Sequence, residues 1–259
     1  MIEYNPHEKF DILKFQFEML GVDEVARELS SKMKKNIKQL YSADGTLSED
    51  DLALVDLHLS SIKEHPIAIV DNIGTVYEIR DTILYYVSTN KLAENNRGLI
   101  VSIDHSLLTK AEDNDSEKQT LDKLMHMLVG LKKFLSSKNI KVMFFVLSQL
   151  NRDLESTDRV NNPKLHYPTK NDLYGASSVY YSSDYVFILH RPVLIEGLGN
   201  WYGPSRVGFQ QGLPVYNPTN PKQAMIYLHI IKERFGSNKI IPMLDELQFA
   251  RLVETNLGE

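Results

Sequence analysis

Residues 98–104 read GLIVSID, and residues 140–147 read IKVMFFVL. Both stretches are short, almost continuous apolar runs, which is the pattern of strands that are buried on both faces. Between them, leucines recur at the three-and-four spacing of an amphipathic helix, at Leu121, Leu124, Leu128, Leu131 and Leu135. Two such strands joined by a helix are typical of a mostly parallel sheet with helices on both faces. These residues therefore predict an α/β fold with its functional groups at the carboxyl ends of the strands.

The alternation of strand and helix continues toward the N-terminus. Residues 12–18 alternate apolar and polar side chains and predict a strand. Apolar residues at helical spacing over residues 22–40 predict an amphipathic helix, with Asp23 as its candidate cap. Capping-box patterns predict two further helix starts, at Ser48 and Thr75, with the short strand IAIVD between those helices. The N-terminal half is thus expected to repeat a strand-and-helix unit.

The C-terminal part departs from this pattern. Residues 151–183 are rich in Asn, Asp, Pro, Ser and Tyr without a helical or strand period, which predicts a long loop. A strand is expected at residues 185–191, followed by a Gly- and Pro-rich excursion over residues 194–220. The final strand, from Met225, is expected to pair with residues 239–243 as a C-terminal β-hairpin. We expect the whole chain of 259 residues to form a single domain.

Composition limits the class of protein. Apolar residues make up 42% and charged residues 24% of the chain, which indicates a globular protein rather than a disordered one. A net charge of −5 argues against indiscriminate nucleic-acid binding, although a local basic loop could still hold a DNA strand. The absence of cysteine excludes disulfides, thiolate nucleophiles and zinc–thiolate sites. No apolar run reaches the ~20 residues of a membrane span and the first residues lack a secretion signal, so we expect a cytoplasmic protein without a membrane partner.

Polar residues close three of the predicted strands. Asp104 follows an apolar strand, where nucleotide-hydrolysing folds hold Mg²⁺, and Glu18 is placed to act as a general base. The segment LSQLNR delivers Ser148, Gln149 and Asn151 as neutral groups that could sense a phosphate or a bound water. Each also has a plainer interpretation: an Asp that ends a strand and caps the next turn, a solvated Glu, and an ordinary strand-end turn. Taken singly, none of these residues decides the function.

The order of these motifs resembles the DnaB family of replicative DNA helicases along nearly the whole chain. FQFEM, from Phe15, is similar to the family's strand ending in the catalytic glutamate, and LIVSID followed by HSLL is similar to its Walker B segment. LSQLNRDLES is close to the family's signature of that region, and NDLYGASSVYYSSDYVFILHR parallels its DNA-contacting loop and the strand that follows. IIKERFGS, from Ile230, has the family's Lys-x-Arg-x-Gly pattern, whose Lys and Arg reach the γ-phosphate of a neighbouring subunit. Five motifs in this order imply a RecA-like P-loop ATPase core.

The resemblance implies a function and assigns roles to residues. The chain would belong to a motor that uses ATP and Mg²⁺ to move along single-stranded DNA and unwind duplex DNA, as a homo-hexameric ring with primase or a helicase loader as further partners. Glu18 is then the catalytic base, Asp104 the metal-site carboxylate and Gln149 the sensor. Lys232 and Arg234 are catalytic residues that act in trans. Further residues of the nucleotide site are Ser148, Arg152 and Arg191. Candidates for binding DNA phosphates are Arg159, Lys164, Lys170, Gly175 and Ala176.

Two departures from the family bear on this interpretation. The stretch SSVYYSSD stands where a Gly-rich, acidic segment is usual, and its Tyr180 and Tyr181 could stack on bases or pack internally, with packing favoured. The sequence also contains no G-x-x-x-x-G-K-[ST] phosphate-binding loop (Walker A) and no helical collar domain. We therefore expect the chain alone to bind ATP poorly and to be inactive as an enzyme.

The absent loop leaves several interpretations open. The first is a helicase split, as in interrupted phage genes, between this chain and a polypeptide that carries the phosphate-binding loop. The alternatives are a catalytically inactive remnant that binds DNA or a ring, a fragment of a longer gene, and a RecA-like recombinase or clock-type ATPase, which LSQLNR and the Lys-x-Arg ending fit less well. A missing strand and helix also predict exposed apolar surface where they would dock.

Overall fold

The computed structural model describes residues 9–42, 47–72, 74–112, 114–205 and 211–256. The chain divides into two compact units, Met1–Gln149 and Leu150–Glu259, and each is built around its own sheet. The expectation of a single domain over the whole chain stays a prediction. In the described ranges no helix is long and apolar enough to cross a membrane.

The first unit contains a parallel sheet of four strands in the order β2-β1-β3-β4. These are β1 (Phe10–Gln16), β2 (Ile67–Val70), β3 (Gly98–Asp104) and β4 (Val142–Val146). The parallel sheet expected from the apolar runs is therefore confirmed. β1 ends two residues before Glu18, so this glutamate lies on the turn that follows the strand rather than in it.

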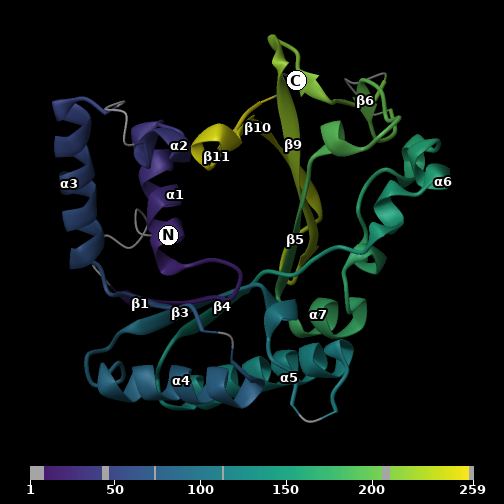
Figure 1. The fold of residues 1–259 in the computed structure, drawn as a ribbon. Helices are drawn as coiled ribbons and strands as arrows, with labels where there is room; N and C mark the ends of the chain where they lie inside the picture. Colours follow the sequence, from purple (N-terminus) through teal and green to yellow (C-terminus); the bar gives the residue numbers. More distant parts are fainter. Residues whose placement is uncertain (1–8, 43–46, 73, 113, 206–210, 257–259) are drawn as a thin grey trace. The chain divides into compact units, whose positions relative to one another are not determined.

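Helices cover both faces of this sheet, as Figure 1 shows: α4 and α5 lie on one side of β1, β3 and β4, and α1 and α3 lie on the other. The helices are α1 (Gly21–Met33), α2 (Ile37–Leu40), α3 (Glu49–Glu64), α4 (Val76–Thr89), the 3₁₀ turn η2 (Ser106–Leu108) and α5 (Glu117–Ser137). The leucines of α5 singled out above are all buried and form the core with the apolar residues of β1 and β3. Burial of each such side chain contributes about 1.5–3 kcal/mol.

The predicted helix ends are partly right. The capping boxes of Ser48 and Thr75 both form, as expected. The helix predicted over residues 22–40 is wrong in its length, because Lys34 takes a left-handed conformation (φ 52°) and separates α1 from α2. Asp23 does not cap α1: the N-cap is Leu20, and Asp23 lies in the first turn, where its charge is favourable to the helix dipole.

The second unit contains an antiparallel sheet in the order β11-β10-β9-β5, with β8 on the edge of β9 (Figure 1). Its strands are β5 (Tyr185–His190), β8 (Tyr216–Asn217), β9 (Asn220–Glu233), β10 (Lys239–Glu246) and β11 (Arg251–Glu254). The C-terminal hairpin is confirmed as β9 and β10, but β9 begins at Asn220 rather than Met225 and β11 follows it, so β9 is not the final strand. Shorter elements are β6 (Trp201–Tyr202), β7 (Leu213–Pro214), η6 (Pro192–Leu194) and η7 (Leu247–Phe249).

The segment predicted as a long loop, residues 151–183, consists instead of short helical turns. They are η3 (Arg152–Glu155), α6 (Thr157–Val160), η4 (Pro163–Leu165), η5 (Lys170–Asp172) and α7 (Ala176–Ser182). Side chains of Asn151, Asn162 and Thr169 accept hydrogen bonds from backbone N–H groups at the starts of three of these turns. The Asn- and Thr-rich composition that suggested a loop thus supplies helix caps.

Candidate functional site

The strand order brings three of the predicted polar strand ends to one edge of the first sheet. β1, β3 and β4 are adjacent and parallel, so their carboxyl ends lie together. The backbone N–H of Phe17 donates to the Asp104 carbonyl at 2.7 Å, and that of Ser106 donates to the Leu147 carbonyl at 2.9 Å. These bonds tie the turn that carries Glu18 to Asp104, and the turn after Asp104 to the end of β4.

His105 connects the side chains of this edge. Its Nε2 lies 3.9 Å from a carboxylate oxygen of Glu18 and 3.5 Å from the side-chain nitrogen of Gln149. The predicted base and the predicted sensor therefore share one imidazole as their neighbour. Sequence reasoning did not single out His105, although its position directly after Asp104 could have indicated it.

Asp104 lies in an environment that disfavours its own charge. Partial burial raises its pKa, and the nearby Glu18 carboxylate raises it further, while His105 acts in the opposite direction. A carboxylate held this way gains from a neighbouring cation, which would restore the lost solvation. The structure thus brings Glu18 and Asp104 together as two acidic groups of unequal exposure, since Glu18 is mostly exposed.

Several buried polar atoms at this edge have no hydrogen-bond partner among the described residues. They are Gln16 Oε1, His105 Nδ1, Ser106 Oγ and Ser148 Oγ. All four belong to the carboxyl ends of β1, β3 and β4 or to the residues that follow. Buried polar groups are rarely left unpaired, so these atoms are suited to a bound water or a polar ligand.

The residues at this edge fit part of a Mg²⁺–nucleotide site. Two carboxylates and several neutral polar atoms suit a hydrated Mg²⁺, which usually keeps water and phosphate ligands and takes few from the protein. In agreement, no group of three His, Cys, Asp or Glu side chains in the described ranges could hold a metal ion by itself. The sequence offers no phosphate-binding loop, so the cradle for the phosphates has to come from elsewhere.

Lys232 and Arg234 lie at the end of β9 in the second unit, and the chain itself holds both. The Lys232 ammonium donates to the Tyr180 carbonyl at 2.6 Å and lies 4.8 Å from the centroid of the Tyr180 ring. Arg234 forms an ion pair with Asp184 at 2.9 Å and stays half-exposed. Both cations are therefore ordered at the C-terminal end of α7, with the Arg234 guanidinium still accessible.

Comparison with known proteins identifies the family. The model of the DnaB-like helicase C-terminal domain matches residues 2–254. The chain belongs to this family. A search of curated proteins gives no match.

Solved structures confirm the fold of this DnaB-like domain. One similar structure is that of a DnaB-like replicative helicase, described with its interactions with primase: TM-score 0.66, 18% identity, covering 94% of this chain and 50% of that chain. Another is an ATPase domain solved on its own: TM-score 0.68, 18% identity, covering 95% of this chain and 75% of that chain. The chain thus spans half the length of the first structure, and at this identity both show a shared RecA-like α/β fold.

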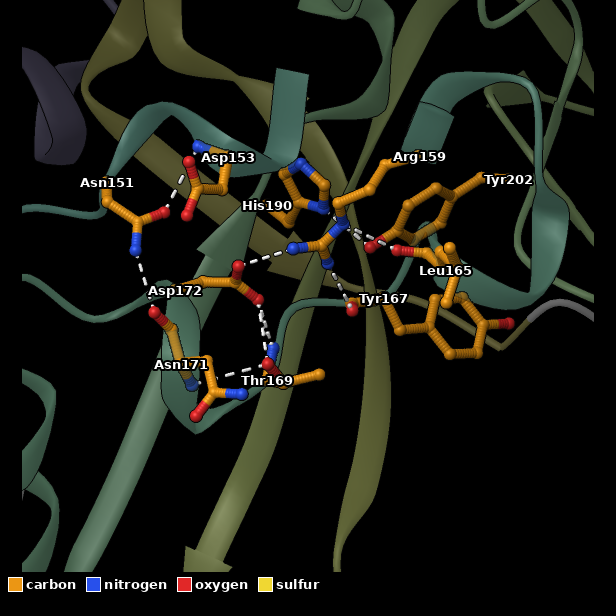
Figure 2. Close-up of polar contacts among 10 residues, drawn as sticks. All are labelled: Asn151, Asp153, Arg159, Leu165, Tyr167, Thr169, Asn171, Asp172, His190 and Tyr202. Atoms are coloured by element: carbon orange, nitrogen blue, oxygen red, sulfur yellow. Dashed lines mark hydrogen bonds and ion pairs between the residues drawn. The ribbon is translucent and has the colours of Figure 1, made fainter. Parts of the chain in front are cut away.

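Within the DnaB-like domain, Arg159 has an internal role that its sequence position did not predict. Figure 2 shows its guanidinium between the Asp172 carboxylate, with which it forms an ion pair, and the carbonyls of Leu165 and Tyr167, which accept at 2.9 and 3.0 Å. The Asp172 carboxylate also accepts from the backbone N–H and hydroxyl of Thr169. Since its guanidinium is used to hold the segment 151–183 together, we no longer place Arg159 among the residues proposed to bind DNA.

The other basic residues of the second unit differ in their exposure. Lys164 and Lys170 are exposed, and Lys170 lies 6.0 Å from the Tyr180 ring. Arg191 pairs with Asp245 on β10, and Arg152 is exposed at the start of η3. These contacts leave the two lysines as the accessible cations of the predicted DNA-binding segment.

The backbone and the tyrosines of this segment are also placed. Gly175 adopts φ 64° as the N-cap of α7, and Ala176 is the first residue of that helix. Tyr180 packs against Lys232, as the sequence favoured, whereas Tyr181 meets Tyr180 edge-on at 5.6 Å and is otherwise exposed. Tyr181 is therefore the tyrosine of the pair that is available to another molecule.

Proposed function

We propose that this chain is the larger part of a replicative helicase motor that hydrolyses ATP, moves along single-stranded DNA and unwinds duplex DNA. It would act in a homo-hexameric ring in the cytoplasm, together with a polypeptide that supplies the phosphate-binding loop. The observation that carries the proposal is the meeting of Glu18, Asp104 and Gln149 at one sheet edge, from three strands far apart in the chain. The family assignment over residues 2–254 supports it.

The residues of this edge divide the chemistry between them. Asp104 would hold Mg²⁺, directly or through water, and bound Mg²⁺–ATP supplies the transferable phosphoryl group and neutralises charge on it. Glu18 orients a water and takes up its proton, as a general base at the mostly exposed end of the site. Gln149, next to His105, lies where a change at the base can be passed to the segment that begins at residue 151.

Lys232 and Arg234 would complete the site of a neighbouring subunit. A guanidinium stabilises the charge that spreads over a transferring phosphoryl group, and supplying it from the neighbour makes hydrolysis depend on ring assembly. In this chain Arg234 is paired with Asp184, so reaching the neighbour requires that ion pair to be exchanged for the phosphate. Asp184 thus keeps the finger ordered until a neighbour is present.

Single-stranded DNA would be held by its phosphates. Lys164, Lys170 and the backbone N–H groups near Gly175 and Ala176 are suited to phosphate oxygens, which carry no sequence information. Binding is therefore expected to be insensitive to sequence and sensitive to salt. The similar replicative helicase structure is described with primase, and a primase or a helicase loader is a candidate further partner here.

The test is nucleotide binding and unwinding by the purified chain, alone and with the polypeptide encoded directly upstream. A fluorescent ATP analogue with Mg²⁺ reports binding, and a forked duplex with a labelled strand reports unwinding. We expect neither activity from the chain alone and both from the complex. As a control, replacing the phosphate-loop lysine of the partner with alanine should abolish both activities without dissociating the complex. Failure to bind nucleotide in either case would favour the alternative, a catalytically inactive remnant that binds DNA or a ring.

A further inference from the structure

β4 forms one edge of the parallel sheet, and its sequence is not that of an edge strand. It pairs with β3 on one side, and no strand in the described part of the chain pairs with its other side. Its residues, VMFFV, include none of the charges or prolines with which natural proteins usually protect a strand edge. Parallel sheets are normally covered on both faces and continuous apolar strands normally lie inside them. β4 therefore has the sequence of an interior strand at an open edge.

The side chains of β4 show the same incompleteness. Met143, Phe145 and Leu147, which alternate along the chain and so share one face, are 54%, 39% and 46% exposed. Three large apolar side chains in a row on one strand form a patch that water disfavours. This face requires a covering element in addition to a neighbouring strand.

The backbone of β4 is set up to receive that strand. The Lys141 carbonyl accepts from Leu99 N at 2.8 Å and Leu147 N donates to the Ile103 carbonyl at 3.0 Å, so these odd-numbered residues direct their backbone groups to β3. Backbone groups alternate sides along a strand, which turns those of Val142, Phe144 and Val146 to the open edge. A parallel strand placed there would satisfy these donors and acceptors.

We propose that the open edge of β4 binds, in parallel, the strand of the partner polypeptide that leads into the phosphate-binding loop. This inference rests on the proposed function, and three observations select that occupant. A strand parallel to β4 ends at the same sheet edge as Asp104, so the loop that follows it arrives at the candidate nucleotide site. Ser148, which directly follows β4, has a buried hydroxyl without a described partner there.

The third observation is that β4 lacks two elements, and the phosphate-binding loop is built as strand, loop and helix, which supplies both. The strand fits the edge, and the helix after the loop fits the exposed face of Met143, Phe145 and Leu147. In addition, this chain corresponds to 75% of the similar ATPase domain, so a further segment of that domain has no counterpart here.

Hydrogen exchange with single-amide resolution tests the proposal. In the free chain the amides of Val142, Phe144 and Val146 should exchange faster than those of Met143 and Phe145, which face β3. In the complex with the polypeptide encoded directly upstream, protection of the three edge-facing amides should rise by about tenfold or more. The same sample is titrated with the fluorescent ATP analogue, so that strand binding and nucleotide binding are measured together.

A pair of charge substitutions provides the matched variants. Met143→Lys with Phe145→Lys places two charges on side chains that are exposed in the free chain, so its folding is retained, and the charges are desolvated when the partner docks. We expect the affinity of the complex to fall by about tenfold or more. Tyr85→Lys, on the exposed face of α4 in the same unit, should leave the affinity unchanged.

The possible outcomes separate this inference from the proposed function. Restored nucleotide binding with the edge-facing amides still unprotected would overturn the strand proposal and leave the helicase proposal intact. Protection of those amides that rises with the concentration of the chain alone would show that a second copy occupies the edge, which also overturns it. A partner that forms no complex and restores no nucleotide binding would end both proposals.

Discussion

Arg159 and Asp172 make the most consequential side-chain contact of the second unit, because both groups are largely buried and each is the charged partner of the other. Arg159→Ala leaves the Asp172 carboxylate buried without its cation, and we expect a loss of about 3–5 kcal/mol in the free energy of unfolding. Urea denaturation of the chain measures this loss. Lys164→Ala, an exposed change in the same segment, should stay within about 0.5 kcal/mol of the parent. Unchanged stability with weakened DNA binding would return Arg159 to the DNA-binding set.

His190 gives the second unit a pH-dependent stability. Burial, and then the nearby Arg159 charge, lower its pKa to about 4, while Asp172 acts in the opposite direction. The ring is neutral in the fold and bonds to the Tyr202 hydroxyl, which also meets His229. Because the unfolded chain binds the proton from about pH 6.5 downward, the stabilisation is complete above that pH and is lost as the pH falls toward 4.

The expected loss from His190 over that window is about 3 kcal/mol, at about 1.4 kcal/mol for each pKa unit. Thermal melts from pH 7.5 to pH 4 measure it. His190→Gln should flatten the decline between pH 6.5 and 4, and the surface substitution His126→Gln should not. A parallel decline in the His190→Gln variant would show that other groups cause the pH dependence.

Individual elements were predictable where local chemistry decides them. Capping boxes at Ser48 and Thr75 set helix starts through hydrogen bonds within four residues, and the apolar runs of β3 and β4 could hardly be anything but buried strands. The break at Lys34 was not predictable, because a lysine in the left-handed conformation has no sequence signature. β11 was missed since its four residues are held as a strand by pairing with β10.

The candidate site was predictable as a set of residues and not as a geometry. Motif order singled out Glu18, Asp104 and Gln149, but the order β2-β1-β3-β4, which makes their strands neighbours, follows from sheet packing that no local pattern encodes. For the same reason the contacts of His105 were missed. The internal role of Arg159 was not predictable either, because a charge in a polar segment looks like a ligand-binding group until its buried carboxylate is known.

At the scale of the whole molecule, the proposed motor requires that two chains share each catalytic site. One subunit contributes Glu18, and its neighbour contributes Arg234. In the complex with the phosphate-loop polypeptide, Glu18→Gln and Arg234→Ala should each reduce ATP turnover by about a thousandfold or more while sparing nucleotide binding. Arg251→Ala, which removes another ion-paired arginine of the same sheet, serves as the control and should retain turnover.

Mixing the two inactive variants before assembly then decides whether the residues act across a subunit boundary. In a head-to-tail ring of equal parts, about a quarter of the interfaces pair an intact Glu18 with an intact Arg234, so about that fraction of turnover should return. If both residues served the same chain, every site in the mixture would carry one defect and turnover would stay at the level of the single variants. Recovery should also require assembly, so mixing rings that are already formed should restore activity only as fast as subunits exchange.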